Sequence, residues 1–187
     1  MSDNDRELKS AFDIALERAS KLGGISSDEK QKLQEEKLAS IGIALSKRYM
    51  SGLPIRDVEM ELEKYKEDRR EIVCYLLACL MDELNLKDPD GAEPILEAAR
   101  HFSGKPKVVE NIRALLGEYQ KAMEKAWQGS QSKLGAVKRK EMKAKGISGS
   151  AVEPVIETST EWLQIKQQLD STYKKRLEGI KIPLHAL

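Results

Sequence analysis

The sequence predicts an all-α protein: a helical bundle of five or six helices, followed by an extended C-terminal arm and a final amphipathic helix. Charged residues make up 34% of the 187 positions and hydrophobic residues 40%, while aromatic residues reach only 5%. This composition favours helices with wide solvated faces over a β-sandwich. Apolar residues also recur at helical spacing, between Gly, Pro and capping residues. We expect the bundle at 1–128, a basic linker and the arm at 129–158, and the C-terminal helix and apolar tail at 159–187.

The first two predicted helices are separated by a pair of glycines. Apolar residues recur at helical spacing from Leu8 to Leu22, and Gly23 and Gly24 end that helix. Ser26, followed three residues later by a glutamate, has the pattern of a capping box and starts the second helix. This helix is expected to end at the sequence SGLP, residues 51–54, which supplies a glycine and a helix-breaking proline.

From Val58 to Cys79 the apolar residues alternate in steps of four and three, which is the spacing of a coiled-coil seam. Arg69 is the one residue that interrupts this seam. We predict a single long helix across it because the segment holds no Gly or Pro, and the alternative is two helices that meet there. Its second half, IVCYLLACLM at 72–81, is apolar on all sides and should lie at the centre of the fold.

The remaining predicted helices begin at turn or capping signals. The sequence KDPDGAEP indicates a turn, with Pro94 in the first turn of a short helix that reaches His101. The next helix carries apolar residues in steps of four and three up to Trp127. Thr158 and Glu161 form a second capping-box pattern before the last amphipathic helix, and the apolar tail after it should dock on the protein. The predicted core is Ile41, Leu45, Leu62, Ile72, Leu76, Leu80, Ile112, Leu115 and Tyr119.

Composition also restricts the cellular setting. The net charge is only +1, so the whole molecule has no field that attracts nucleic acid or an anionic membrane. The first residues are acidic and polar, unlike a secretory signal, and the longest apolar run falls far short of the roughly 20 residues that span a bilayer. Cys74 and Cys79 differ by roughly 140° on a helix, so they cannot bridge each other and suit a reducing compartment. We expect a cytoplasmic protein that does not enter a membrane.

No pattern in the sequence carries an enzyme or metal chemistry. Asp88, Asp90 and Glu97 match part of an EF-hand loop, but the first ligand position is occupied by Leu86. Glu93, Glu97 and His101 share one helical face, for which a solvated surface is the simpler explanation. The sequence GISGS resembles a nucleophile elbow but has Ser150 where that pattern needs glycine. We therefore predict no catalytic, cofactor-binding or metal-binding residue, and an enzyme is the less favoured class.

The stretch KAKGISGSAVEPVIETSTEW, residues 143–162, differs from the rest of the chain. Its glycines permit backbone geometries that other residues avoid, and its β-branched residues prefer extended conformations. We predict that the arm from Gly146 to Ile156 lies extended in a groove, on its own bundle or on a neighbouring subunit, and that Trp162 anchors the following helix. The predicted interaction residues are Gly146, Ile147, Ser148, Gly149, Ser150, Val152, Pro154 and Trp162.

These same residues resemble the tail of an uncharacterised family of small helical prokaryotic proteins, with the pattern GISGSAV-x-P followed by a tryptophan that opens a helix. The resemblance covers about a fifth of the chain. It implies a small helical protein and transfers no activity, catalytic residue or cofactor.

Two function classes remain after these exclusions. The seam spacings, the all-round apolar helix and the apolar tail favour a non-enzymatic scaffold or protein-interaction module that self-associates, with a dimer as the favoured homo-oligomer, and that has a protein partner the sequence does not name. The alternative is a nucleic-acid-associated factor that uses the basic segment 133–145. Its possible phosphate contacts are Lys138, Arg139, Lys140 and Lys143. This alternative is not favoured because no aromatic residue is interleaved for base stacking.

Overall fold

The computed structural model describes residues 26–147 and 155–185, and these residues form six α-helices and one 3₁₀ helix without any strand. The all-α prediction is confirmed. The helix predicted between Leu8 and Leu22 lies outside the described residues. The elements in chain order are α2 (Ser27–Met50), α3 (Ile55–Glu63), η1 (Lys66–Asp68), α4 (Arg69–Glu83), α5 (Pro89–Ser103), α6 (Pro106–Ala144) and α7 (Thr160–His185).

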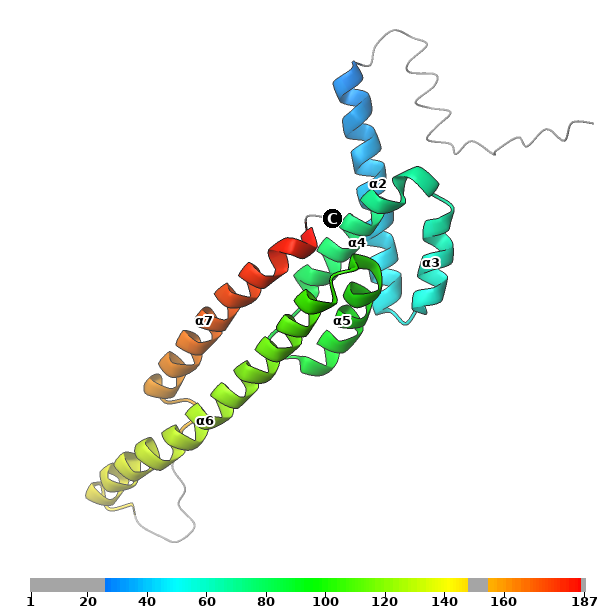
Figure 1. Ribbon diagram of the computed structural model, residues 1–187. Coiled ribbons are helices and arrows are strands. Elements are labelled where there is room, and N and C mark those ends of the chain that lie inside the picture. Colours follow the sequence, from blue (N-terminus) through cyan, green and yellow to red (C-terminus); the bar gives the residue numbers. More distant parts are fainter. Residues whose placement is uncertain (1–25, 148–154, 186–187) are drawn as a thin grey trace, which may run out of the picture.

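Helix α4 lies at the centre of the bundle, in contact with α2, α3, α5 and α7 (Figure 1). It contributes six buried side chains to the core: Ile72, Val73, Leu76, Leu77, Leu80 and Met81. The central position predicted for this apolar helix is therefore correct. Eight of the nine predicted core residues are buried, and Ile41 is partly buried against the same cluster. Cys74 and Cys79 on α4 are partly buried and form no disulfide.

Helices α2 and α4 approach closely because Gly42 has no side chain. A Cβ atom at position 42 would lie 2.6 Å from the Cβ atom of Tyr75 and 2.7 Å from the carbonyl oxygen of Ile72. Leu38 and Leu45, on either side of this glycine along α2, are buried in the core. The backbone contact at Gly42 thus sets the distance between the two helices.

The prediction of one long helix from Val58 onward is wrong, because α3 ends at Glu63 and η1 precedes the start of α4. Lys66 has a φ of 30°, a conformation that does not continue a right-handed helix. An Arg69 amino group lies 2.6 Å from a Glu59 carboxylate oxygen. On a straight helix, residues ten apart are separated by about 15 Å along the axis. The reversal removes Arg69 from the apolar seam and places it in an ion pair, while Val58 and α4 still share one core.

Helix starts agree with the capping patterns in one of three places. Ser26 and Glu29 form the predicted capping box: the Glu29 N–H donates to the Ser26 hydroxyl, and Glu29 accepts from the Ser26 N–H. Helix α5 begins at Pro89, so Pro94 lies inside the helix and not in its first turn as predicted. Helix α7 is capped by Ser159, whose hydroxyl accepts from the Trp162 N–H, so the predicted box at Thr158 is one residue too early.

Helices α6 and α7 form an antiparallel hairpin whose far end extends beyond the other helices (Figure 1). Helix α6 has 39 residues, about 60 Å at 1.5 Å per residue, and it continues without a break through the basic segment after residue 128. Helix α7 runs through most of the apolar tail, and Leu177 and Leu184 are buried in the core. Within the tail, Leu184 is buried in the core and Ile180 packs partly buried against it.

A polar network fastens α7 to the bundle. The Tyr119 hydroxyl donates to Asp170 at 2.7 Å, and the Lys87 amino group lies 2.6 Å from the other carboxylate oxygen of Asp170. Burial opposes ionisation of Asp170, but the hydrogen bonds from Lys87 and Tyr119 outweigh it and hold the pKa of this carboxyl below its usual range. Burial and the Asp170 carboxylate both raise the pKa of Tyr119, which therefore remains a donor.

This network predicts a pH-dependent contribution to stability. Because the pKa of Asp170 is lower in the folded protein, its contribution is present above the ordinary value of about 3.9 and is lost as the pH falls through the folded value. We expect Asp170→Asn to lower the free energy of unfolding at neutral pH, and the difference from the wild type to shrink below about pH 4. Urea unfolding at a series of pH values checks this. A difference that stays constant from neutral to acidic pH would contradict the prediction.

Candidate functional site

The far end of the hairpin, residues 133–147 and 155–165, holds every predicted interaction residue that the structure describes, and we call it the hairpin tip. Helix α6 ends at Ala144, and Gly146, two residues later, has a φ of 75°, in the left-handed region. The Ile147 N–H donates to the Met142 carbonyl at 2.9 Å, and the Gly146 N–H donates to the Lys143 carbonyl at 3.1 Å. This glycine therefore turns the chain out of α6, as its residue type predicts.

Most of the predicted extended arm lies outside the described residues, including Ser148, Gly149, Ser150, Val152 and Pro154. Its last two residues, Val155 and Ile156, return to α6 ahead of α7. The Lys138 amino group donates to the Val155 carbonyl at 2.8 Å, and Ile156 is buried over Gly135, where a Cβ atom would lie 3.5 Å from the Ile156 Cδ1 atom. The arm thus rejoins its own chain, and its extended conformation stays a prediction.

Trp162 anchors the start of α7, as predicted. It is 8% exposed, and its ring packs edge-on against Trp127 of α6 with ring centroids 4.9 Å apart and planes at 63°. Sequence reasoning placed Trp127 near a helix end but did not pair the two rings. The pair joins the start of α7 to α6.

The surface of the hairpin tip combines apolar and charged side chains. The exposed apolar residues are Val137, Ile147, Val155, Leu163 and Ile165. Of the predicted phosphate contacts, Arg139, Lys140 and Lys143 are exposed and make no ion pair among the described residues, whereas Lys138 is half-buried. Glu157 and Glu161, near the start of α7, are also exposed. The hairpin tip therefore exposes apolar side chains on both of its segments, cations on α6 and two anions near the start of α7.

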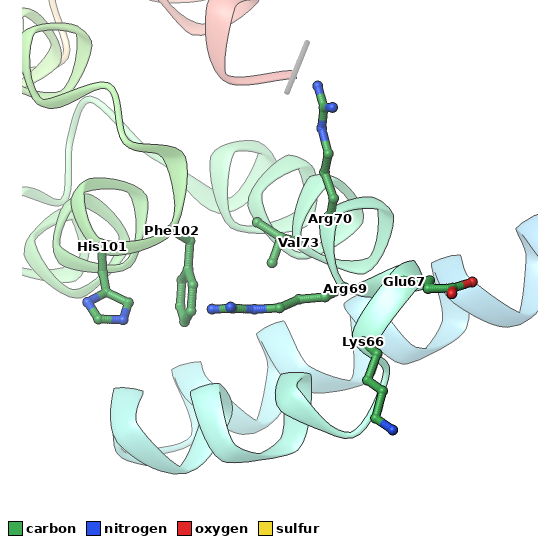
Figure 2. Close-up of a pocket in the computed structure, with 7 residues that line it drawn as sticks. All are labelled: Lys66, Glu67, Arg69, Arg70, Val73, His101 and Phe102. Carbon is green, nitrogen blue, oxygen red and sulfur yellow. The ribbon is translucent and has the colours of Figure 1, made fainter.

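A pocket that the sequence analysis missed lies where η1 and the start of α4 face the end of α5 (Figure 2). Its volume is about 500 Å³, and its lining residues are Lys66, Glu67, Arg69, Arg70, Val73, His101 and Phe102. Beside it, one Glu59 oxygen lies 2.6 Å from an Arg69 amino group, and the other contacts His101 Nε2. The His101 hydrogen bond, with the charges of His101 and Arg69, keeps the pKa of Glu59 below its usual range although burial opposes this. The signal in the sequence was Arg69, a charged residue in an otherwise apolar seam.

The residues considered as metal ligands have other roles. Asp88 caps α5 by accepting from the Gly91 N–H at 2.9 Å, and Glu93 forms a bidentate pair with Arg113. His101 contacts Glu59, which belongs to α3. Within 26–147 and 155–185, no group of three His, Cys, Asp or Glu side chains is arranged to hold a metal ion.

Comparisons of the chain with known protein families, with curated proteins and with solved structures find no match. Among the described residues, no helix is both long enough and apolar enough to cross a membrane.

Proposed function

We propose that the protein is a non-enzymatic helical interaction module that forms a homodimer through the hairpin tip. The observation that carries this proposal is the group of exposed apolar side chains at the end of a hairpin that extends beyond the bundle. Val137 is 53% exposed on α6, Val155 is 58% exposed ahead of α7, and Leu163 is 51% exposed on α7. Exposed apolar residues gathered in one place are typical of protein-interaction surfaces.

The charges of the hairpin tip support a second copy of the chain as the partner. A twofold interface brings the same surface of both subunits together, so that surface has to be complementary to itself. Cations Arg139, Lys140 and Lys143 on α6 and anions Glu157 and Glu161 near α7 lie on the two sides of one hairpin. An antiparallel pairing of two tips sets the basic side of one against the acidic side of the other, with the apolar residues between them.

The test is the oligomeric state of the purified protein, measured by light scattering coupled to size-exclusion chromatography over a range of concentrations. We expect a dimer for the wild type and a monomer for Val137→Glu and Leu163→Glu, because each places a charge in the apolar contact. Met60→Glu is the matched control, since Met60 is 49% exposed on α3, outside the hairpin tip. A monomeric wild type, or a control that dissociates the dimer as strongly as the tip variants, would show that the proposal is wrong.

The second candidate is nucleic-acid binding by the basic side of α6. Arg139, Lys140 and Lys143 are exposed on a helix without an ion pair among the described residues, so their charges are open to phosphates. Titration with DNA and RNA at low and high salt separates the candidates. Binding that falls steeply with salt supports this second function, and absence of binding at low salt removes it.

A further inference from the structure

Helix α2 carries a line of apolar side chains on one side. Ala39, Ile43 and Met50 follow one another in steps of four and seven residues, so they share that side of the helix. Ile43 and Met50 are 39% and 41% exposed, and Ala39 is half-buried. Among the described elements, α2 packs mainly against α4 and makes fewer contacts with α3 (Figure 1). The apolar line is therefore open to solvent within the described part of the chain.

The charge of Arg48 marks the side of α2 that borders α3. Lys64 and, to a smaller extent, Arg48 lower the pKa of Glu61, which belongs to α3. Ile43 is five residues before Arg48, which places it roughly 140° away around the helix. The apolar line thus lies on the side of α2 that faces away from α3.

Helix α4 adds Tyr75 to this surface. A Cβ atom at Gly42 of α2 would lie 2.6 Å from the Tyr75 Cβ atom, so the two residues are in contact. Burial of Tyr75, followed by the charges of Glu71 and Glu35, raises the pKa of its hydroxyl. Glu35 is four residues before Ala39 on the same side of α2, so Tyr75 borders the apolar line. We call Ala39, Ile43, Met50 and Tyr75 together the α2 face.

The rim of the α2 face has a net negative charge. The carboxylates on this side of α2 and α4 are Glu35, Glu36, Glu71 and Asp82, and the cations are Lys32 and Lys47. None of the four carboxylates makes an ion pair among the described residues. An apolar centre with a charged rim is the usual composition of a protein interface, and the sign of the rim charge selects partners of the opposite sign.

The spacing of the apolar residues fits a helical partner. Ile43 and Met50 are about 10 Å apart along α2, at 1.5 Å per residue. This separation matches the i and i+7 anchor positions of a second helix that packs alongside. An extended peptide would instead need an open strand edge, and the described residues form no strand.

We propose that the α2 face binds an amphipathic helix of another protein, whose apolar stripe is flanked by lysine or arginine residues. Ile43 and Met50 contact the apolar stripe, and the rim carboxylates attract the flanking cations. The α2 face shares no residue with the hairpin tip, so this interaction is independent of the proposed dimer.

Fluorescence anisotropy of the full-length protein tests this with three labelled peptides of about 18 residues, or about five helical turns. The first peptide is an amphipathic helix of leucine and lysine. The second has each lysine replaced by glutamate, and the third has the composition of the first in scrambled order. We expect the first peptide to bind about tenfold more tightly than each of the others, because it combines the apolar stripe with the complementary charge. Added salt should weaken its binding, since exposed charges are screened.

Variants of the α2 face locate the binding. Ile43→Asn should weaken binding of the first peptide about tenfold, because it removes one apolar anchor. The double variant Glu36→Gln and Glu71→Gln should bind more weakly than the wild type at low salt and equally at high salt. Met60→Asn is the matched control and should bind like the wild type, since Met60 is 49% exposed but lies on α3.

The proposal is overturned if the first peptide binds no more tightly than the other two, or if Ile43→Asn binds it like Met60→Asn. Two other occupants of the α2 face give distinct results, and either result also overturns the proposal. If Phe12→Asn binds the first peptide and the wild type does not, the N-terminal segment of the same chain covers the face. If Ile43→Asn dissociates a dimer as strongly as Val137→Glu, the face is a contact between two copies of the chain.

Discussion

Gly42→Ala is expected to lower the free energy of unfolding by about 2–3 kcal/mol, because the added methyl group overpacks the contact between α2 and α4. The new Cβ atom would lie 2.6 Å from Tyr75 Cβ and 2.7 Å from the Ile72 carbonyl oxygen. Both atoms belong to, or lie next to, the backbone of the central helix, so no side chain can rotate out of the way. The helices have to separate, and the buried contacts of Leu38 and Leu45 beside the glycine are then loosened. Chemical denaturation of the two proteins measures the loss.

Gly117→Ala is the matched control for this prediction. Gly117 lies within α6, and apart from its chain neighbours and the nearby backbone of its own helix, no atom lies within 4 Å of a Cβ atom built there. Because alanine is a better helix former than glycine, this variant should be neutral or more stable by up to about 1 kcal/mol. Equal destabilisation by both substitutions would mean that the close approach at Gly42 does not carry the effect.

The apolar periodicity predicted much of the bundle because the helices bury apolar faces at regular spacing. The central position of α4 followed from a segment with apolar residues on every side, and the capping box at Ser26 marked the start of α2. The failure between Val58 and Cys79 has a specific cause. A helix break that contains no Gly or Pro depends on tertiary contacts, which the local sequence does not reveal. Here the contact is the ion pair of Arg69 with Glu59 on the preceding helix. The interruption of the seam by Arg69 was the available signal, and two helices were the correct alternative.

The candidate sites were less accessible to sequence reasoning than the fold. The pocket is lined by residues 66–73 and by His101 and Phe102, which lie near the end of the next helix, α5. No local pattern pairs these segments, because their proximity results from the packing of α5 beside α4. At the hairpin, composition alone indicated that Trp162 is an anchor, but its partner Trp127 is 35 residues earlier and faces it only because α6 and α7 are antiparallel.

Trp162→Ala is expected to lower the free energy of unfolding by roughly 3–5 kcal/mol, as for other large-to-small substitutions of buried aromatic residues. Trp162 is 8% exposed and packs edge-on against Trp127, so its removal leaves a cavity at the point where α7 begins. Gln164→Ala is the matched control, because Gln164 lies two residues later on the same helix and is exposed. Its effect on stability should be small.

Trp162 could stabilise the hairpin within one subunit or the contact between two subunits, and its pairing with Trp127 distinguishes these two roles. Because Trp162 contacts Trp127 of its own chain, its loss first weakens the hairpin within one subunit, whereas Leu163 faces outward on the proposed dimer surface. We therefore expect Trp162→Ala to reduce the unfolding free energy of the monomer itself. This is measured at protein concentrations below the dissociation constant of the dimer. If the loss of stability disappeared on dilution, the ring would instead act mainly across subunits. Hydrogen exchange of the α7 amides provides a second measure, since an anchored helix start protects them and a loosened one does not.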